Sequence, residues 1–462
     1  MQALKKFCLF VLTSAAMGTL IAMVVMGMAG PDMSCSGALL RPGSPGISLM
    51  MAQAVSESRI LAAAAAGQED VLMPGIPRLH PGPPVIAVDP GHGGEDEGCS
   101  RDGVMEKDVN LAIAQLLRIK LEESGYKVMM VREGDTFMSG EQRVGKANKS
   151  TADLYVSIHQ NTWEDTKVKG IETWYSGGKG AGDSRRLAQL VHQETAAASG
   201  APDRELHDDS DFDVTKQTCM PSCLIETGFL SNAQERAGLT GTEYQEKLAQ
   251  GIARGIDLYF NPKTMYLTFD DGPSEENTNA VLDVLKARNI KAAFFVVGEN
   301  VRKHPETARR IVDEGHTIGI HCDCHDYEKI YESVDSYMED FQAAYKTVLE
   351  ATGVQARLYR FPGGSINTYN RKIYKEIIRE MDAKGFVCFD WNASLDDALG
   401  KADPRELIAN ARASALGRKR VVMLAHDVVH STALCLEELI DGFPEYRMEP
   451  LTPETEPMVF EP

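Results

Sequence analysis

The sequence predicts an α/β protein with two domains that follow an N-terminal transmembrane helix. Short apolar strands alternate with amphipathic helices from Val85 onward, which is the pattern of α/β layer architectures. The alternation stops at Asn261-Pro262 and starts again almost at once, and 462 residues with 43% hydrophobic positions suffice for more than one core. An uncharged apolar run, residues 7–30, precedes both domains.

The N-terminal run predicts where the chain acts. Lys5 and Lys6 precede 24 uncharged residues, enough for one helix to span a bilayer. The positive flank places the N-terminus inside and everything after the run outside. A signal anchor over residues 1–30 is favoured because the run is longer than the apolar core of a signal peptide, and a cleaved signal peptide with secretion to the cell wall is the alternative. Both interpretations export the remaining chain.

The segment between this run and the first domain is expected to be a flexible stalk. Residues 31–84 are rich in Gly, Ala, Pro and Ser and end in Pro-Gly-Pro-Pro. Such a composition is typical of linkers that do not form a packed module.

The charge of the chain excludes one class of partner. The formal net charge is −19, and no block of Lys and Arg stands out against it. Nucleic-acid binding needs such a basic excess on one face. We therefore expect no nucleic acid partner.

The first domain, residues 85–262, is expected to form an open α/β sheet. Strands are predicted at 85–89, 126–131, 153–159, 170–175 and 223–229, and helices at 109–121, 183–199 and 243–259.

Four polar residues of this domain form a candidate metal site. His92 lies on a glycine turn after the first strand, Glu106 opens the next helix, and His159 ends another strand. Zinc accepts imidazole nitrogen and carboxylate oxygen together, and three protein ligands leave a position for water. Glu226, at the end of CLIETGF, would point into the same cleft as a general base. Hydrogen-bonded turn histidines are the alternative interpretation.

Five motifs in order give this domain a family resemblance. DPGHGG, MEKDVNLA, ADLYVSIHQN, GIETWY and CLIETGFLSN span the whole of 85–262 and resemble the zinc-dependent N-acetylmuramoyl-L-alanine amidases. The resemblance implies His92, Glu106 and His159 as zinc ligands and Glu226 as the catalytic carboxylate. It also implies cleavage of the amide between N-acetylmuramic acid and the L-alanine of the stem peptide.

The second domain, residues 263–455, is built from repeated βα units. Short apolar strands are predicted at 265–269, 292–298, 317–321, 358–361, 386–391 and 421–426. Polar residues at the strand C-termini suggest a barrel or an open parallel sheet with its site at that end. Residues 456–462 are expected to form a loosely packed tail.

The strand ends of the second domain carry a second candidate site. Adjacent carboxylates at 270 and 271 repel each other unless a cation or a proton separates them, and two histidines follow at a spacing of four. In the mechanism that these types allow, the metal is held by Asp271, His321 and His325. Asp270 would take a proton and His426 would protonate the leaving nitrogen.

Two charged residues would support that chemistry. Arg360 would hold Asp270 ionised, and the charge of Asp390 would orient Arg360. Each feature alone has a plainer interpretation: a turn, a helix cap or an ordinary ion pair.

The motifs of the second domain resemble the polysaccharide deacetylases. TFDDGP, HCDCH, RFPGG, FDW and LAH follow one another over residues 265–455. The resemblance implies a distorted (β/α) barrel, the roles just assigned, and a pocket for the acetyl methyl lined by Trp391 and Leu424, with Phe361 also binding substrate. The chain departs from the family pattern at Cys322, where Ser or Thr is usual, and by a reduced acidic motif before Trp391.

Two cysteines between the histidines raise the alternative of a thiolate zinc site. A ligand from Cys322 or Cys324 would close the coordination position that catalysis needs. We therefore expect one Zn²⁺ per domain without thiolate ligands, and another divalent ion is an alternative in the second domain.

Together the two resemblances imply a bifunctional enzyme of the cell wall. Its partners would be peptidoglycan glycan strands and stem peptides, with the membrane reached through the N-terminal helix. Loss of the peptide and then of the acetyl group would leave a carboxylate near an amine, which could close to the muramic δ-lactam of the spore cortex. The alternatives are a wall-binding or scaffolding protein with inactive sites and an enzyme active only as a deacetylase.

Overall fold

The computed structural model describes residues 82–177, 181–208, 212–399 and 403–461. The predicted membrane segment, residues 1–30, and the predicted stalk up to residue 81 lie outside these ranges. Of the helices that the structure describes, none combines the length and the apolar character needed to cross a bilayer.

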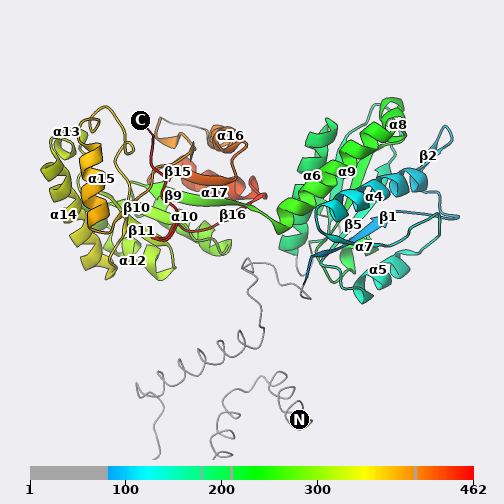
Figure 1. The fold of residues 1–462 in the computed structure, drawn as a ribbon, viewed down its shortest axis with the longest axis horizontal. Coiled ribbons are helices and arrows are strands. Elements are labelled where there is room, and N and C mark those ends of the chain that lie inside the picture. The colour runs from blue at the N-terminus through cyan, green and yellow to red at the C-terminus, as the bar shows by residue number, and fades with distance from the viewer. Residues whose placement is uncertain (1–81, 178–180, 209–211, 400–402, 462) are drawn as a thin grey trace, which may run out of the picture. The chain divides into compact units, whose positions relative to one another are not determined.

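The first domain is built on a six-stranded sheet (Figure 1). In spatial order its strands are β4 (Lys127–Met130), β1 (Val85–Pro90), β5 (Leu154–Asn161), β8 (Ser222–Phe229), β6 (Ile171–Tyr175) and β7 (Asp203–Asp208). The first four run parallel, β6 is antiparallel to β8, and β7 is parallel to β6. The predicted open α/β sheet is therefore confirmed, with β7 as an additional edge strand.

Helices cover both faces of this sheet. They are α4 (Glu106–Glu123), α5 (Gly140–Lys149), α6 (Ala181–Ser199), α7 (Asp213–Lys216), α8 (Ala233–Leu239) and α9 (Thr242–Phe260), and a small hairpin is formed by β2 (Ser100–Arg101) and β3 (Val104–Met105). Alternate residues of β1 enter two separate cores, because successive side chains of a strand point to opposite faces. Ile86 and Val88 pack with α4, α6 and α9, and Val85 and Ala87 pack on the opposite face.

The second domain contains a parallel sheet of eight strands. They are β13 (Val387–Cys388), β12 (Leu358–Tyr359), β11 (Thr317–Cys322), β10 (Ala293–Val297), β9 (Lys263–Asp270), β15 (Arg420–His426) and β14 (Ala393–Ser394) in spatial order, with β16 (Tyr446–Met448) beside the start of β9. Within the described ranges, the end strands β13 and β14 form no ladder with each other. This arrangement agrees with the distorted (β/α) barrel that the resemblance implied.

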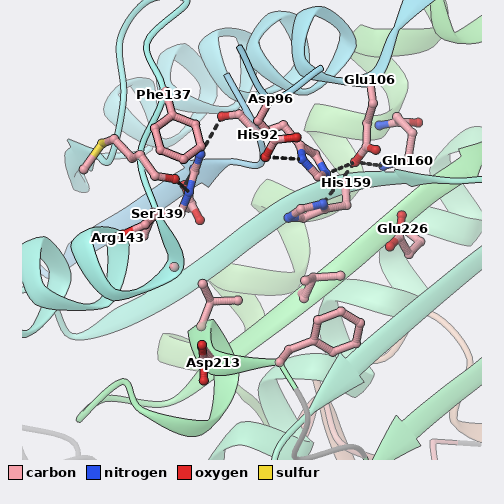
Figure 2. A pocket seen from close by; sticks show the side chains of 16 residues that line it. His92, Asp96, Glu106, Phe137, Ser139, Arg143, His159, Gln160, Asp213 and Glu226 are labelled. Atoms are coloured by element: carbon pink, nitrogen blue, oxygen red, sulfur yellow. Dashed lines mark hydrogen bonds and ion pairs between the residues drawn. The ribbon is translucent and has the colours of Figure 1, made fainter. Parts of the chain in front are cut away.

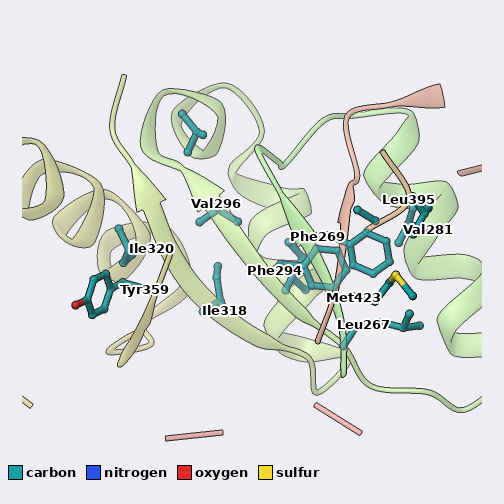
Figure 3. Close-up of a cluster of buried hydrophobic side chains, with 14 of the residues drawn as sticks. Leu267, Phe269, Val281, Phe294, Val296, Ile318, Ile320, Tyr359, Leu395 and Met423 are labelled. Carbon is teal, nitrogen blue, oxygen red and sulfur yellow. The ribbon is translucent and has the colours of Figure 1, made fainter. Parts of the chain in front are cut away.

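Eight helices of the described ranges follow or join these strands. They are α10 (Asn277–Ala287), α11 (Gly298–Lys303), α12 (Pro305–Asp313), α13 (Tyr327–Ile330), α14 (Val334–Thr352), α15 (Tyr374–Ala383), α16 (Pro404–Ala415) and α17 (His430–Asp441), with one 3-10 turn, η1 (Asp397–Leu399). Leu267 and Phe294 belong to the large core between strands and helices (Figure 3). Phe295 and Val422 belong to a smaller cluster on the opposite face of the same strands.

The C-terminal segment differs from the expected loose tail. Met458 packs against the smaller cluster, to which the fully buried Leu451, just before the expected tail, belongs. Met458 also forms a parallel bridge with Phe389, just beyond β13. The reason lies in the strand order: the edge at β13 has free backbone groups, and the C-terminal segment pairs with them.

Candidate active sites

The predicted ligands of the first domain meet at one edge of its sheet. His92 follows β1, Glu106 is the first residue of α4, and His159 lies near the end of β5 (Figure 2). Their ligand atoms all lie within 4.8 Å of one another. Oε1 of Glu106 is 3.2 Å from Nε2 of His92 and 3.0 Å from Nδ1 of His159. The positive N-terminal end of α4 favours a carboxylate at this position.

The backbone around these ligands leaves room for them. His92 has a φ of 60°, a left-handed conformation that is uncommon outside glycine. A Cβ at Gly91 would lie 2.2 Å from Cε1 of His159, and a Cβ at Gly98 would lie 2.5 Å from Oε2 of Glu106. The glycines of this loop therefore allow the chain to pass close to two of the ligands.

Neighbouring groups orient the ligands. Nδ1 of His92 lies 2.8 Å from Oδ2 of Asp96, and the carboxylate can only accept, so Nδ1 carries the proton. Nε2 is then the ring nitrogen that faces Glu106. The carboxylate of Glu106 accepts hydrogen bonds from the backbone N–H of Cys99 and of Gln160. Asp96 is a positioning residue that the sequence motifs did not predict.

Electrostatics favour the ionised form of the carboxylate in this group. Burial opposes ionisation of Glu106, but hydrogen bonds from His159 and His92 outweigh it and lower the pKa of Glu106. Burial also opposes protonation of His92, and Glu106 and Asp96 together raise the pKa of His92 above its usual value. An ionised carboxylate between two imidazoles is a donor set that fits zinc.

Glu226 lies beside the ligand group, as predicted. It is paired in register with His159 across β8 and β5. Its Oε2 is buried and has no hydrogen-bond partner in the described part of the chain. Burial, with the charges of Glu106 and Glu172, raises the pKa of Glu226 well above its usual range. A buried carboxyl of raised pKa that faces a cation site fits a proton-transfer role.

A cavity of about 520 Å³ opens over these residues. Phe137, Met138 and Phe212 supply apolar wall (Figure 2). Arg143, on α5, is hydrogen-bonded inside the protein: its guanidinium donates to Asp89 at 2.5 Å and to the carbonyl oxygen of Pro90. The cavity therefore combines apolar walls with the polar ligand group at its base, as small-molecule sites commonly do.

The predicted ligands of the second domain also meet. Asp271 follows β9, His321 lies in β11, and His325 lies on the turn after β11. Their ligand atoms lie within 4.8 Å of one another. Oδ1 of Asp271 is 3.5 Å from Nε2 of His321 and 3.2 Å from Nε2 of His325, yet it is buried without a hydrogen bond. Such an orphaned oxygen between two imidazole nitrogens fits a cation ligand.

Backbone and hydrogen bonds hold this group in place. Asp271 has a φ of 75° and His325 a φ of 52°, which are left-handed conformations of the kind that cluster at functional sites. Nδ1 of His321 donates to the carbonyl oxygen of Arg360 at 2.9 Å. Its Nε2 is thereby left with the lone pair that faces Asp271.

Arg360 contacts Asp270 as predicted, and Asp390 is hydrogen-bonded to Arg360 through its backbone. Nη1 of Arg360 donates to Oδ1 of Asp270 at 2.8 Å, and both side chains are buried. The guanidinium also donates to the hydroxyl oxygen of Thr268 at 2.7 Å and to the carbonyl oxygens of Phe389 at 2.7 Å and of Asp390 at 3.1 Å. The Asp390 carboxylate instead accepts from the backbone N–H and the hydroxyl of Ser365. The strand end thus presents the backbone carbonyl of Asp390, and not its carboxylate, as the hydrogen-bond partner of Arg360.

His426 has a partner that the motif reading missed. Its Nδ1 lies 2.7 Å from Oδ1 of Asp397, and its backbone N–H donates to Oδ2 of the same residue. Burial lowers the pKa of His426, but the hydrogen bond that its ring donates to Asp397, with the charges of Asp270 and Asp271, raises it to about 9. The signal for Asp397 is the acidic pair in SLDD, six residues after FDW.

The predicted substrate-binding residues divide into two groups. Leu424 lies in β15, and Trp391 is half-buried beyond β13. Phe361 is fully buried, 5.1 Å from the ring of Tyr337. The prediction that Phe361 binds substrate is therefore wrong, because its ring belongs to the aromatic core.

Neither cysteine of the HCDCH motif joins the ligand group. Cys322 is buried, Cys324 is half-buried, and burial raises the pKa of both thiols. Among the described residues, the two groups given above are the clusters that could hold a metal. The thiolate alternative therefore has no geometric support.

Comparison with known proteins follows the same division of the chain. Residues 86–257 match the model of the N-acetylmuramoyl-L-alanine amidase family, and residues 258–381 match that of the polysaccharide deacetylases. The germination-specific N-acetylmuramoyl-L-alanine amidase of Bacillus subtilis is 35% identical over 193 residues, which cover 39% of this chain and 81% of the relative.

Two further relatives show how much of each protein is shared. N-acetylmuramoyl-L-alanine amidase LytC of Bacillus subtilis is 40% identical over 175 residues. These residues are 38% of this chain and 35% of LytC. The catalytic domain of the peptidoglycan N-acetylglucosamine deacetylase of Eubacterium rectale is 32% identical, with 44% of this chain covering 93% of that structure at a TM-score of 0.41. This chain thus spans about a third of the length of LytC.

Proposed function

Since the chain belongs to the N-acetylmuramoyl-L-alanine amidase family through residues 86–257 and continues into a segment of the polysaccharide deacetylase family, we propose that it is a bifunctional peptidoglycan hydrolase. The first site would cleave the amide between N-acetylmuramic acid and L-alanine. The second would remove N-acetyl groups from amino sugars of the glycan. The observation that carries this proposal is the pair of three-ligand groups, each with a separate proton-transfer residue beside it.

Both ligand groups suit zinc, and the second suits other divalent ions as well. His92, Glu106 and His159 would hold one ion, and the Asp-His-His group of the second domain would hold the other. A bound Zn²⁺ acts as a Lewis acid and lowers the pKa of water. One zinc per domain is the expected stoichiometry, and metal analysis of the purified protein tests it.

In the first site, Glu226 would transfer the proton. Its raised pKa lets the carboxylate accept a proton from water and return it to the leaving nitrogen near neutral pH. Its Oε2, which has no partner in the described residues, is free to make that hydrogen bond. The apolar walls formed by Phe137 and Phe212 would contact the substrate.

In the second site, two hydrogen-bonded pairs divide the acid and base roles. Asp270 would accept the proton from water, and its ion pair with Arg360 holds the carboxylate in place for that role. His426 would donate to the leaving nitrogen, since the Asp397 carboxylate keeps it protonated at neutral pH. Trp391 and Leu424 would line the pocket for the acetyl methyl.

A test of both activities uses matched variants. Glu226→Gln should abolish release of stem peptides from purified peptidoglycan and leave acetate release intact. Asp270→Asn should do the reverse. A protein that releases neither product and binds no metal would instead be a wall-binding protein, and one that releases only acetate would be a deacetylase alone.

The two reactions would act in sequence on one sugar. Loss of the peptide and of the acetyl group from the same muramic residue leaves a lactyl carboxylate near a free amine, which together close to the muramic δ-lactam with loss of water. Tethering two consecutive activities raises the local concentration of the intermediate. Mass spectrometry of digested peptidoglycan should detect lactam, and deacetylation confined to glucosamine would refute this sequence.

We further propose that the catalytic part lies outside the cell membrane, held by residues 1–30 as a single-pass anchor. The support is the run of 24 uncharged residues after Lys5 and Lys6. The protein should remain in the membrane fraction after a high-pH wash and keep its N-terminus. A mature protein that begins after residue 30 would show secretion to the cell wall instead.

A further inference from the structure

The C-terminal segment lies against the residues that hold the base of the second site. Met458 bridges Phe389 at the free edge beyond β13. The N–H of Asp390 donates to the carbonyl oxygen of Met458 at 2.6 Å. Two residues on, the N–H of Phe460 donates to Oδ2 of Asp390 at 2.6 Å. The segment therefore binds Asp390 through both its backbone and its side chain.

Asp390 connects this segment to the predicted base. Its carbonyl oxygen accepts from Nη2 of Arg360 at 3.1 Å, and the neighbouring carbonyl of Phe389 accepts from Nε at 2.7 Å. Nη1 of the same guanidinium donates to Asp270 at 2.8 Å. A continuous series of hydrogen bonds thus runs from Phe460 through Asp390 and Arg360 to Asp270, and all three of the latter side chains are buried.

The ring of Phe460 has a second contact at the same site. It packs edge-on against Trp391, with the ring centroids 5.0 Å apart. It also covers Gly364 of the RFPGG motif, where a Cβ would lie 2.5 Å from Cε2 of Phe460. A side chain at position 364 would displace the ring, so glycine at this position and Phe460 fit each other.

We propose that Met458–Phe460 is a positioning element of the deacetylase site: its backbone holds Asp390, which fixes Arg360 against Asp270, and its Phe460 ring sets the orientation of Trp391. This inference rests on the proposed deacetylase function. Phe460 is a positioning residue, because it acts through Asp390 and Trp391. The C-terminal segment thereby belongs to the active site, although it follows the last motif, LAH, by some thirty residues.

The two contributions of Phe460 are separable by substitution. Phe460→Ala removes the ring but keeps the N–H, and Phe460→Pro removes both. A hydrogen bond to a charged group contributes about 1.5–3 kcal/mol, which corresponds to a factor of about 10 to 100 in rate where the bond supports catalysis. The comparison of the proline variant with the alanine variant therefore isolates the contribution of the Phe460 N–H, which donates to Asp390.

The experiment measures acetate release from purified glycan by the full chain. Phe460→Ala should raise KM several-fold, and Phe460→Tyr should restore it. Phe460→Pro should lower kcat at least tenfold below that of Phe460→Ala. Glu461→Ala, an exposed neighbour, should match the unsubstituted protein. Peptide release by the first site serves as an internal reference and should not change in any variant.

A double-mutant cycle excludes a merely structural role. In an Asp390→Ala background, Phe460→Pro should differ little from Phe460→Ala, because the carboxylate acceptor is gone and the N–H keeps only its 3.3 Å contact with Oγ of Ser365. Equal kcat for the two single variants, or an undiminished proline effect without Asp390, would overturn the inference. If the unsubstituted protein releases no acetate, the proposed deacetylase function itself fails, and the inference fails with it.

Discussion

Replacement of Asp397 by asparagine should move the pH dependence of deacetylation. Oδ1 of Asp397 lies 2.7 Å from Nδ1 of His426, and Oδ2 accepts from the hydroxyl of Thr432 and from the backbone N–H of His426. Asn keeps the size of the side chain and removes its charge. The perturbation therefore acts on the protonation of His426 more than on packing.

The magnitude follows from the hydrogen bond. Burial lowers the pKa of His426, and the bond to Asp397 is the largest of the contributions that raise it to about 9. A hydrogen bond to a charged group contributes about 1.5–3 kcal/mol, and one pKa unit corresponds to about 1.4 kcal/mol. The pKa of His426 should fall by about 1 to 2 units. Because a general acid acts in its protonated form, the alkaline limb of the acetate-release profile should move to lower pH by the same amount.

The assay follows kcat for acetate release from pH 5 to pH 10. Asp396→Asn is the matched control: Asp396 is exposed and has a φ of 58°, a conformation that asparagine tolerates. Peptide release by the first site should keep its pH profile in both variants. An alkaline limb for Asp397→Asn that superimposes on that of the unsubstituted protein would refute the assignment of His426 as a general acid tuned by Asp397.

Three further predictions concern the metals and the core. Asp96→Asn removes the charged acceptor of His92 Nδ1 and should weaken zinc binding at the first site about 10–100-fold; competition with a chromogenic chelator measures this, and unchanged affinity would contradict it. A strong chelator should abolish both peptide and acetate release, and added Zn²⁺ should restore them; activity that persists in metal-free protein would exclude the metal role. Leu267→Ala empties a site that is 1% exposed in the larger core of the second domain and should destabilise it by about 2–5 kcal/mol. Urea unfolding, monitored through the loss of acetate release, measures this destabilisation. Leu416→Ala is the control: Leu416 is 84% exposed, so this variant should unfold at the same urea concentration as the unsubstituted protein.

For buried, apolar strands, the positions in the structure agree with those that the sequence predicts. VIAVD and VVMLAH are continuous hydrophobic runs, and both occur within one residue of the predicted limits, as β1 and β15. A parallel strand covered on both faces must be apolar throughout, so it is readable from the chain alone. The edge strand β7, DRELHD, has mostly exposed side chains, and no hydrophobic pattern indicates it.

Strand length was less predictable than strand position. The strands expected at 358–361 and 386–391 are reduced to two residues each, β12 and β13. Beyond β13, the carbonyl oxygens of Phe389 and Asp390 accept from the side chain of Arg360. The apolar pattern therefore predicts longer strands than the structure has, because buried apolar side chains continue beyond the residues that pair in a ladder.

The sequence by itself determined the order of the elements and the six candidate ligands, because each ligand lies in a short motif at a strand end or helix start where chain direction dictates its position. Only the tertiary structure decided which groups surround those ligands. Asp397 pairs with His426 from a separate loop, Phe361 enters the core, and Phe460 returns from the C-terminal segment to bind Asp390. Hydrogen bonds to a strand-end residue are made by loops distant in the chain, and no local periodicity constrains where such loops return.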